Sequence, residues 1–143
     1  MSVAFPLPDT EWEATREFWQ AASEGRLVIP RCSACQTWNW YPGEFCRACH
    51  DGALAWTPVS GRGTLFSWAA VDRAFVPAFS EQVPYLTGLV ALAEEPAVRL
   101  VTRLVDCKPG DLCMDLPMRV VYRPLRFPET PGEVMAPFFT PAV

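Results

Sequence analysis

The feature that most constrains this chain is a pair of Cys-x-x-Cys motifs, formed by Cys32 with Cys35 and by Cys46 with Cys49, ten residues apart. Each motif bends the backbone so that two sulfur atoms point to one place. Together they offer four thiolates, the tetrahedral set that Zn²⁺ accepts in structural sites, although iron can also fill such a site. Two disulfides or four inert thiols are disfavoured by the short paired spacing. The pattern therefore predicts a zinc ribbon with these four cysteines as metal ligands.

The predicted metal centre is structural, because four sulfur ligands leave no coordination position open for water or substrate. His50, the only histidine of the chain, follows the second motif directly. We expect it to face solvent near the metal and not to bind it. A histidine-based triad would have to use this one residue, and no nucleophile-elbow motif accompanies it. The sequence therefore predicts no catalytic residue.

Residues 1–25 are expected to form an extended arm followed by a helix over about 10–23. Thr10 offers an N-cap, and Glu13 three residues later completes a capping-box pattern. Gly25 is placed to end the helix in a left-handed conformation. Helical spacing predicts one apolar face made by Trp12, Thr15, Phe18, Trp19 and Ala22.

After the ribbon, assigned to residues 26–56, the apolar pattern changes to a period of two, which is typical of strands. Phe66 and Trp68 are expected to share one face of a strand. The strands are expected at about 53–59, 64–71, 85–93, 98–105 and 118–123. Five antiparallel strands suit an OB-type barrel over 57–126, although a small sandwich fits the periodicity nearly as well. The predicted fold is thus mainly β, with an N-terminal helix, a rubredoxin-like zinc ribbon and a five-stranded OB-fold barrel.

Two Pro-rich, apolar segments lie outside these elements, the loop 72–84 and an extended C-terminal tail over 127–143. A loop this long and this apolar needs a cover, either a partner or a ligand. The alternative is that both segments fold back on the barrel as ordinary core. We expect them to serve as interface or ligand cover.

Charge and composition narrow the class of function. The net charge is −4, and Lys108 is the only lysine, so there is no electrostatic footprint for nucleic acid. The N-terminus lacks a basic stretch followed by an apolar one, so no signal peptide is expected. The longest apolar run, residues 89–93, is too short to cross a membrane. Free thiols that hold a metal suit a reducing compartment, so we expect a cytoplasmic protein.

The ordered string of motifs resembles the zinc-ribbon and OB-fold proteins associated with acyl-CoA metabolism. The likeness covers roughly 12–126 and departs at Gln36, where the family usually has glycine after the first cysteine pair. Besides the cysteine pairs, it is carried by Phe18-Trp19, Glu24-Gly25-Arg26-Leu27, the run 56–68, Pro84-Tyr85, Val98-Arg99-Leu100, Val105-Asp106-Cys107 and Pro109-Gly110-Asp111.

The resemblance implies a non-catalytic accessory subunit. Such proteins pair with thiolase-superfamily enzymes (thiolases, acyltransferases, and aldolases acting on steroid side chains) or with hot-dog hydratases. The partner carries the nucleophile and the general base, while the accessory chain helps to bind or present an acyl-CoA in a heteromeric complex. Aromatic walls suit a long neutral pantetheine arm. The candidates for this acyl-CoA path, which could equally fill the core, are Phe66, Trp68, Phe75, Phe79 and Tyr85, with Arg62 for a CoA phosphate.

Two further functions fit the predicted fold less well. Ribbons and OB folds also bind nucleic acids, but neutralising phosphates needs clustered cations that this acidic chain lacks. An independent enzyme, for example a CoA-thioester hydrolase, would require turnover by the purified chain alone.

Overall fold

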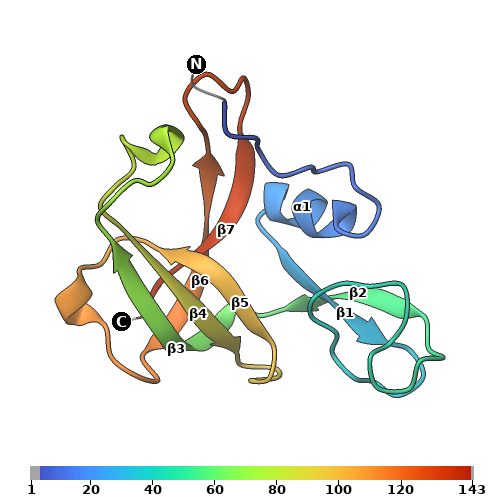
Figure 1. Cartoon of the computed structure of the whole chain (residues 1–143). Helices are drawn as coiled ribbons and strands as arrows, with labels where there is room; N and C mark the ends of the chain where they lie inside the picture. The colour runs from blue at the N-terminus through green and yellow to red at the C-terminus, as the bar shows by residue number, and fades with distance from the viewer. Residues whose placement is uncertain (1–3, 143) are drawn as a thin grey trace.

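The computed structural model describes residues 4–142. An N-terminal helix and a two-stranded sheet with long loops lie to one side of a closed five-stranded barrel (Figure 1). This arrangement confirms the predicted mainly β fold with its ribbon and OB-type barrel. None of the helices in the described part of the chain has the length and apolar character to cross a membrane.

The helix is shorter than predicted. α1 spans Arg16–Ser23, its N-cap is Thr15 without a side-chain capping bond, and Trp12 is 51% exposed instead of lying on the buried face. The predicted start at Thr10 was wrong because Asp9 Oδ1 accepts the backbone N–H of Glu11 at 3.0 Å. This local bond favours a turn over a helical start. The end is as predicted, with Gly25 at φ 74°.

The helix packs on the sheet that frames the ribbon. Strands β1 (Leu27–Cys32) and β2 (Leu54–Val59) pair antiparallel, with Leu27 opposite Val59 and Cys32 opposite Leu54. β1 is buried along almost its whole length because α1 covers it. The cysteine loops extend from the far end of this sheet, at the lower right of Figure 1.

Five strands close the barrel in the order β3-β4-β5-β7-β6. They span Arg62–Val71 (β3), Tyr85–Leu92 (β4), Arg99–Leu104 (β5), Pro117–Leu125 (β6) and Val134–Pro141 (β7). All neighbours pair antiparallel except β5 and β7, which meet in parallel where Leu104 lies opposite Phe139. Two short 3₁₀ helices, η1 (Pro77–Phe79) and η2 (Pro109–Asp111), lie in the loops between strands.

The fifth barrel strand is not the predicted one. The stretch expected at about 53–59 is β2 of the ribbon sheet, and the C-terminal segment supplies β7 instead. Phe139 is fully buried at 0% exposure, so this part of the tail folds back as core and is not a surface cover. The expectation failed because alternation in a Pro-rich segment is too weak to predict a strand whose pairing is long-range.

A one-residue bulge between Leu65 and Ser67 changes the faces of β3. Phe66 lies under the guanidinium of Arg99, 3.8 Å from the ring centroid, on the outer face of the sheet. Trp68 lies opposite Gly88 of β4, which in turn lies opposite the buried Thr102 of β5. The side chain of Trp68 is therefore on the inner face of the sheet. The prediction that Phe66 and Trp68 share a face was therefore wrong, because a bulge inverts the alternation.

The turn between β2 and β3 fixes where the ribbon leaves the barrel. Gly61 adopts φ 77°, which favours glycine. A Cβ atom at this position would also collide with the side chain of Val120 on β6. The N–H of Val120 bonds to the carbonyl of Gly61 at 2.8 Å, so the turn is held against the barrel.

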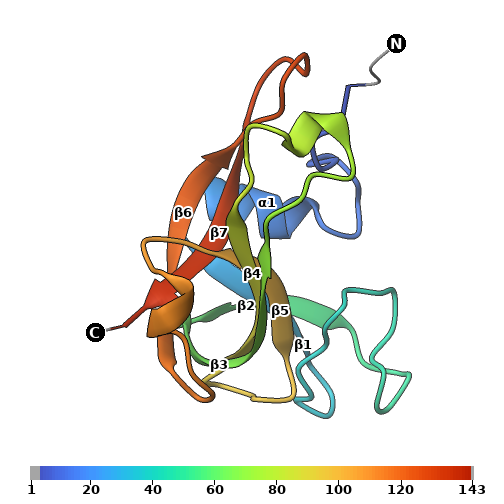
Figure 2. The same ribbon diagram turned by 60° about the vertical axis from the view of Figure 1, so that its left-hand side comes forward.

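The N-terminal arm and two barrel loops meet at one end of the barrel (Figure 2). The ring of Phe5 lies 5.0 Å from Phe79 in the loop 72–84 and 4.8 Å from Phe127 in the β6–β7 loop. The Thr130 hydroxyl donates to the carbonyl of Phe5 at 2.7 Å. Part of the long apolar loop is therefore covered by the chain itself.

Candidate metal centre and neighbouring surfaces

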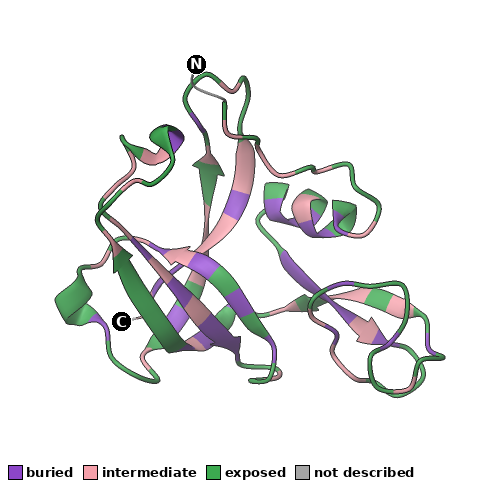
Figure 3. Ribbon diagram, viewed as in Figure 1, coloured by how far each residue is buried: buried purple, intermediate pink, exposed green. Residues whose placement is uncertain are grey.

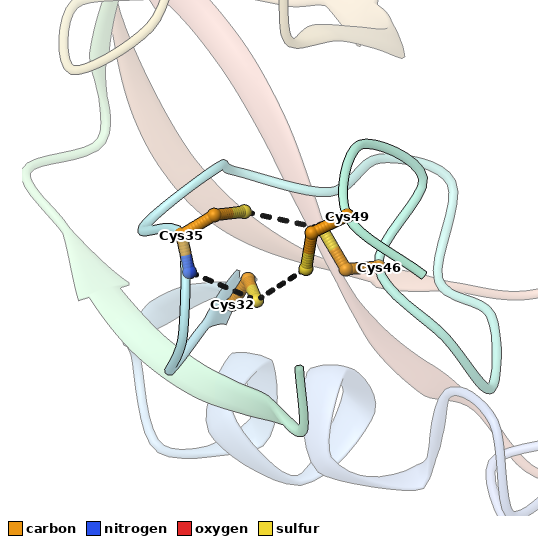
Figure 4. A group of neighbouring side chains, drawn as sticks. All are labelled: Cys32, Cys35, Cys46 and Cys49. Carbon is orange, nitrogen blue, oxygen red and sulfur yellow. Dashed lines mark hydrogen bonds between the residues drawn. The ribbon is translucent and has the colours of Figure 1, made fainter. Parts of the chain in front are cut away.

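The four cysteines of the two motifs converge in the ribbon loops (Figure 4). Their sulfur atoms all lie within 4.8 Å of one another. The distance is 3.7 Å between Cys32 and Cys49 and 3.6 Å between Cys35 and Cys46. Tetrahedral Zn²⁺ with bonds of about 2.3 Å places sulfurs about 3.8 Å apart, whereas a disulfide needs about 2.05 Å. The geometry fits a closed four-sulfur zinc site and does not fit two disulfides.

Backbone N–H groups around the sulfurs favour the thiolate form. Cys35 and Ala48 donate to the sulfurs of Cys32 and Cys46, each at 3.4 Å. The N–H groups of Cys49 and Ala48 help to lower the pKa of Cys46 to about 6. Since the thiolate is the metal ligand, this environment favours binding at Cys46, whereas burial and the side chains of Cys35 and Cys49 raise the pKa of Cys32.

Asn39 supports the site by a hydrogen bond to a ligand sulfur, a role that the sequence did not predict. It is only 2% exposed, and its Nδ2 donates to Cys46 Sγ at 3.6 Å and to the carbonyl of Thr37 at 3.0 Å. Its Oδ1 accepts the N–H of Arg47 at 2.8 Å. Asn39 therefore ties the first cysteine loop to the second. The available signal was a polar residue flanked by tryptophan on both sides.

Gly52 leaves room for the sulfur atom of Cys32 because it has no side chain. It is buried, and a Cβ atom there would collide with Cys32 Sγ and come within 3.1 Å of the Ala34 Cβ. Gly43, in the same loop region, has no atom within 4 Å of its hypothetical Cβ. Glycine is thus required sterically at Gly52 but not at Gly43.

The two cysteine motifs end in the same backbone conformation. Gln36 has φ 64° and donates its N–H to the Cys32 carbonyl at 3.0 Å, and His50 has φ 61° and donates to the Cys46 carbonyl at 3.0 Å. The family glycine that Gln36 replaces therefore corresponds to a left-handed position. His50 is exposed and is not among the side chains that gather at the metal site.

The six residues predicted for the acyl-CoA path do not form one wall. Phe66 and Trp68 are 36% and 37% exposed on opposite faces of β3. Arg62, at the start of β3, is exposed and lies opposite Arg119 on β6. These three residues are accessible, but they are spread along the strand.

The other three residues lie toward the loop between β3 and β4. Phe79 and Tyr85 are half-buried with ring centroids 6.2 Å apart, and the guanidinium of Arg103 lies 4.5 Å from the Tyr85 ring. Phe75 is 86% exposed. Phe79 and Tyr85 thus belong to the covered end of the barrel, and the part of all six residues in binding acyl-CoA stays a prediction.

An apolar cleft of about 330 Å³ lies where the helix, the ribbon and the barrel meet. Phe18 and Trp19 of α1 form one wall, Trp40 and Tyr41 of the ribbon another, and strands β5, β6 and β7 the floor. Sequence reasoning did not find this cleft because its walls come from three segments that only the tertiary fold brings together. Its volume is at the lower end of the range for small-molecule sites, about 300–1,000 Å³.

Both the ribbon part and the barrel part of this chain match models of known protein families. Residues 19–55 match the model of the ChsH2 rubredoxin-like zinc ribbon domain, and residues 56–123 match that of the ChsH2 C-terminal OB-fold domain. A "probable enoyl-CoA hydratase alpha subunit" of Thermomonospora curvata is 37% identical over 129 residues, covering 88% of this chain. The chain spans only 37% of that relative's length. A "DUF35 domain-containing scaffold protein" of Methanocaldococcus jannaschii is 28% identical over 101 residues, 70% of each chain.

Two solved structures are similar to this chain. A DUF35-family protein of unknown function from Sulfolobus solfataricus shares the fold over 77% of this chain and 78% of its own, with a TM-score of 0.57 and 11% identity. A chain in the structure of the Ltp2–ChsH2(DUF35) aldolase matches 97% of this chain and 100% of its own length, with a TM-score of 0.78 and 31% identity. On these grounds the chain belongs to the ChsH2 family of DUF35 proteins, built from a rubredoxin-like zinc ribbon and an OB-fold domain.

Proposed function

We propose that this chain is a non-catalytic accessory subunit that binds a thiolase-superfamily enzyme and helps it to bind or present an acyl-CoA. The observation that carries the proposal is the end-to-end likeness to a chain of the Ltp2–ChsH2(DUF35) aldolase. The name of that aldolase joins two components, and the chain of it that resembles this protein is matched over its whole length. The partner is a thiolase, an acyltransferase or an aldolase, including one that acts on steroid or lipid side chains.

The chemistry of the described residues supports a scaffold role. The predicted metal set consists of four cysteine sulfurs, which leaves no open position on a bound Zn²⁺. The bound metal contributes folding free energy to the ribbon, of the order of 10–16 kcal/mol in small zinc domains. The one histidine is exposed at the end of a cysteine loop. The nucleophile and the general base of the reaction therefore belong to the partner.

The apolar cleft and the exposed aromatics support a part in holding acyl-CoA. Pantetheine is a long, mostly neutral arm, and the cleft offers it aromatic walls, with Thr15, Tyr41 and Thr102 as the lining residues that carry a hydroxyl. Tyr41 is 62% exposed and Val101 is 79% exposed, so the rim of the cleft is open to a partner. Four cysteines poised to bind metal suit a reducing compartment, and we place the complex in the cytoplasm.

Affinity capture from the native cell tests the proposal. The tagged chain is purified in parallel with the tag alone, and co-purifying proteins are quantified by mass spectrometry. We expect one thiolase-superfamily subunit in stoichiometric amount, in a hetero-oligomer that persists on gel filtration. Recovery of nucleic acid that is released by salt would favour a nucleic-acid-binding module instead. Thioester turnover by the purified chain alone would establish an independent enzyme.

A further inference from the structure

The second half of β3 has an unpaired edge. β6 pairs with β3 only at 62–64, and Leu65 exchanges backbone bonds with Asp115 and Leu116. Beyond Leu65, β4 is the one strand that pairs with β3 among residues 4–142. Residues 66–70 are all exposed, and the upper half of β3 is coloured as exposed in Figure 3. This stretch is therefore an open sheet edge.

The direction of the backbone groups on this edge follows from the register. Leu92 donates its N–H to the carbonyl of Val98, so the even-numbered residues of β4 bond to β5 and the odd-numbered ones face β3. The odd-numbered residues lie opposite Ser67, Ala69 and Val71. The N–H and C=O groups of Trp68 and Ala70 therefore point away from β4, toward solvent.

The strand segment that carries these backbone groups is itself uncharged, although the guanidinium of Arg99 stacks on Phe66 at its start. The stretch 63–71 contains no charged residue and no proline, although natural edge strands usually carry such residues to prevent pairing. Large apolar side chains on this strand and in the segments 72–84 and 112–116 are exposed, namely Phe66 at 36%, Trp68 at 37%, Val76 at 40%, Met114 at 60% and Phe75 at 86%. Met114 precedes Asp115, whose N–H bonds to Leu65, so it lies where the open edge begins.

We propose that an extended strand of the thiolase-superfamily partner pairs with the β3 edge at residues 66–71. Two outward residues with one N–H and one C=O each offer at most four backbone bonds, which only another polypeptide in extended form can satisfy together. An uncharged edge selects an uncharged, apolar strand. Four net hydrogen bonds do not offset the cost of association over most of its range, so the edge alone does not suffice to hold two copies of this chain. It suits one element of a larger interface with a second subunit.

The proposal rests on the proposed function, and a single backbone donor tests it. Ala70→Pro removes the outward N–H without removing a bond to β4, and proline is tolerated on edge strands. Ala70→Val is the matched control, because it keeps the N–H and favours strand structure. The probe is the enzyme subunit recovered with the tagged chain, expressed and purified on its own. We expect Ala70→Pro to raise the dissociation constant by about tenfold. We expect Ala70→Val to change it by less than about twofold.

Hydrogen exchange on the unmodified chain gives an independent measurement. In the complex, we expect the amides of Trp68 and Ala70 to exchange at least about tenfold more slowly than in the free chain. A complex that forms while these amides exchange as in the free chain would overturn the docking proposal and leave the proposed function standing. Protection that depends only on the concentration of the lone chain would identify a second copy as the occupant and also overturn it. If no thiolase-superfamily subunit binds, both proposals fail.

Discussion

Replacing Gly52 by alanine tests whether the cysteine cluster is a metal site that a small displacement of one sulfur weakens. The added methyl group would collide with Cys32 Sγ, one of the four predicted ligands, and it would meet Ala34 on its other side at 3.1 Å. The sulfur or the loop must therefore move. The same replacement at Gly43 adds a methyl group with no atom within 4 Å. The pair Gly52→Ala and Gly43→Ala thus makes the same chemical change with and without a steric conflict.

The size of the effect follows from the tolerance of the metal–sulfur bonds. Relieving the collision needs a shift of on the order of 1 Å, whereas ligand distances in metal sites hold to about 0.2 Å. We therefore expect a loss of metal affinity at least as large as that from removing a group that hydrogen-bonds to a metal ligand, about 10–100-fold. This corresponds to about 1.4–2.8 kcal/mol. For Gly43→Ala we expect a change of less than about twofold, because surface replacements without new contacts are nearly neutral.

The assay is competition for Zn²⁺ between the purified chain and a chromogenic chelator, followed at constant pH. The order of affinities should be wild type equal to Gly43→Ala, with Gly52→Ala clearly weaker. Thermal unfolding of the metal-loaded proteins should show the same order. If Gly52→Ala bound zinc as tightly as Gly43→Ala did, Cys32 would not be a ligand in the geometry described here.

Three further replacements test other parts of the structure. Asn39→Ala should weaken zinc binding by about 10–100-fold in the same competition assay, because it removes the buried amide that bonds to a ligand sulfur and joins the two cysteine loops. Gly61→Ala should lower the free energy of unfolding by about 2 kcal/mol or more, since Gly61 combines φ 77° with a steric collision, whereas Gly110→Ala, which meets open space, should change it by less than about 1 kcal/mol in urea titrations. Phe139→Ala should cost about 3–5 kcal/mol because this ring is fully buried, while Phe75→Ala at an 86% exposed position should stay within about 0.5 kcal/mol; equal effects would show that β7 is not part of the core.

The parts of the fold that the sequence predicts well are those set by local patterns. Two cysteine pairs with a short spacer specify the ribbon, because tetrahedral ligation needs only those four positions. The stretch 98–105 alternates cleanly, and Leu100, Thr102 and Leu104 of β5 are buried as this alternation predicts. Gly25 ends the helix in a left-handed conformation as expected.

The predictions that failed depend on contacts between distant segments. β2 and β7 have similar strand character in sequence, and which of them joins the barrel is decided by pairing with β1 and β6. The bulge in β3 moves Phe66 and Trp68 to different faces without any glycine or proline to signal it. Asp9 forms a local bond that delays the helix start, against the capping-box pattern at Thr10.

In the candidate site, too, the features set by a local pattern were predictable and those that depend on the tertiary fold were not. The metal ligands were predictable, but the residues that support them were not. Asn39 and Gly52 matter only because the fold brings them to Cys46 and Cys32. The apolar cleft likewise exists only once the helix, ribbon and barrel are packed together. None of the six residues predicted for the acyl-CoA path lines that cleft.

The most direct test of the central claim is acyl-CoA turnover by the recovered thiolase-superfamily subunit, titrated with this chain. If the chain is an accessory subunit, activity or the affinity for acyl-CoA rises with added chain and saturates at a fixed stoichiometry, while the chain alone turns over nothing. Turnover by the chain alone, or an enzyme whose activity and substrate affinity do not respond to added chain, would show that the chain is not an accessory subunit.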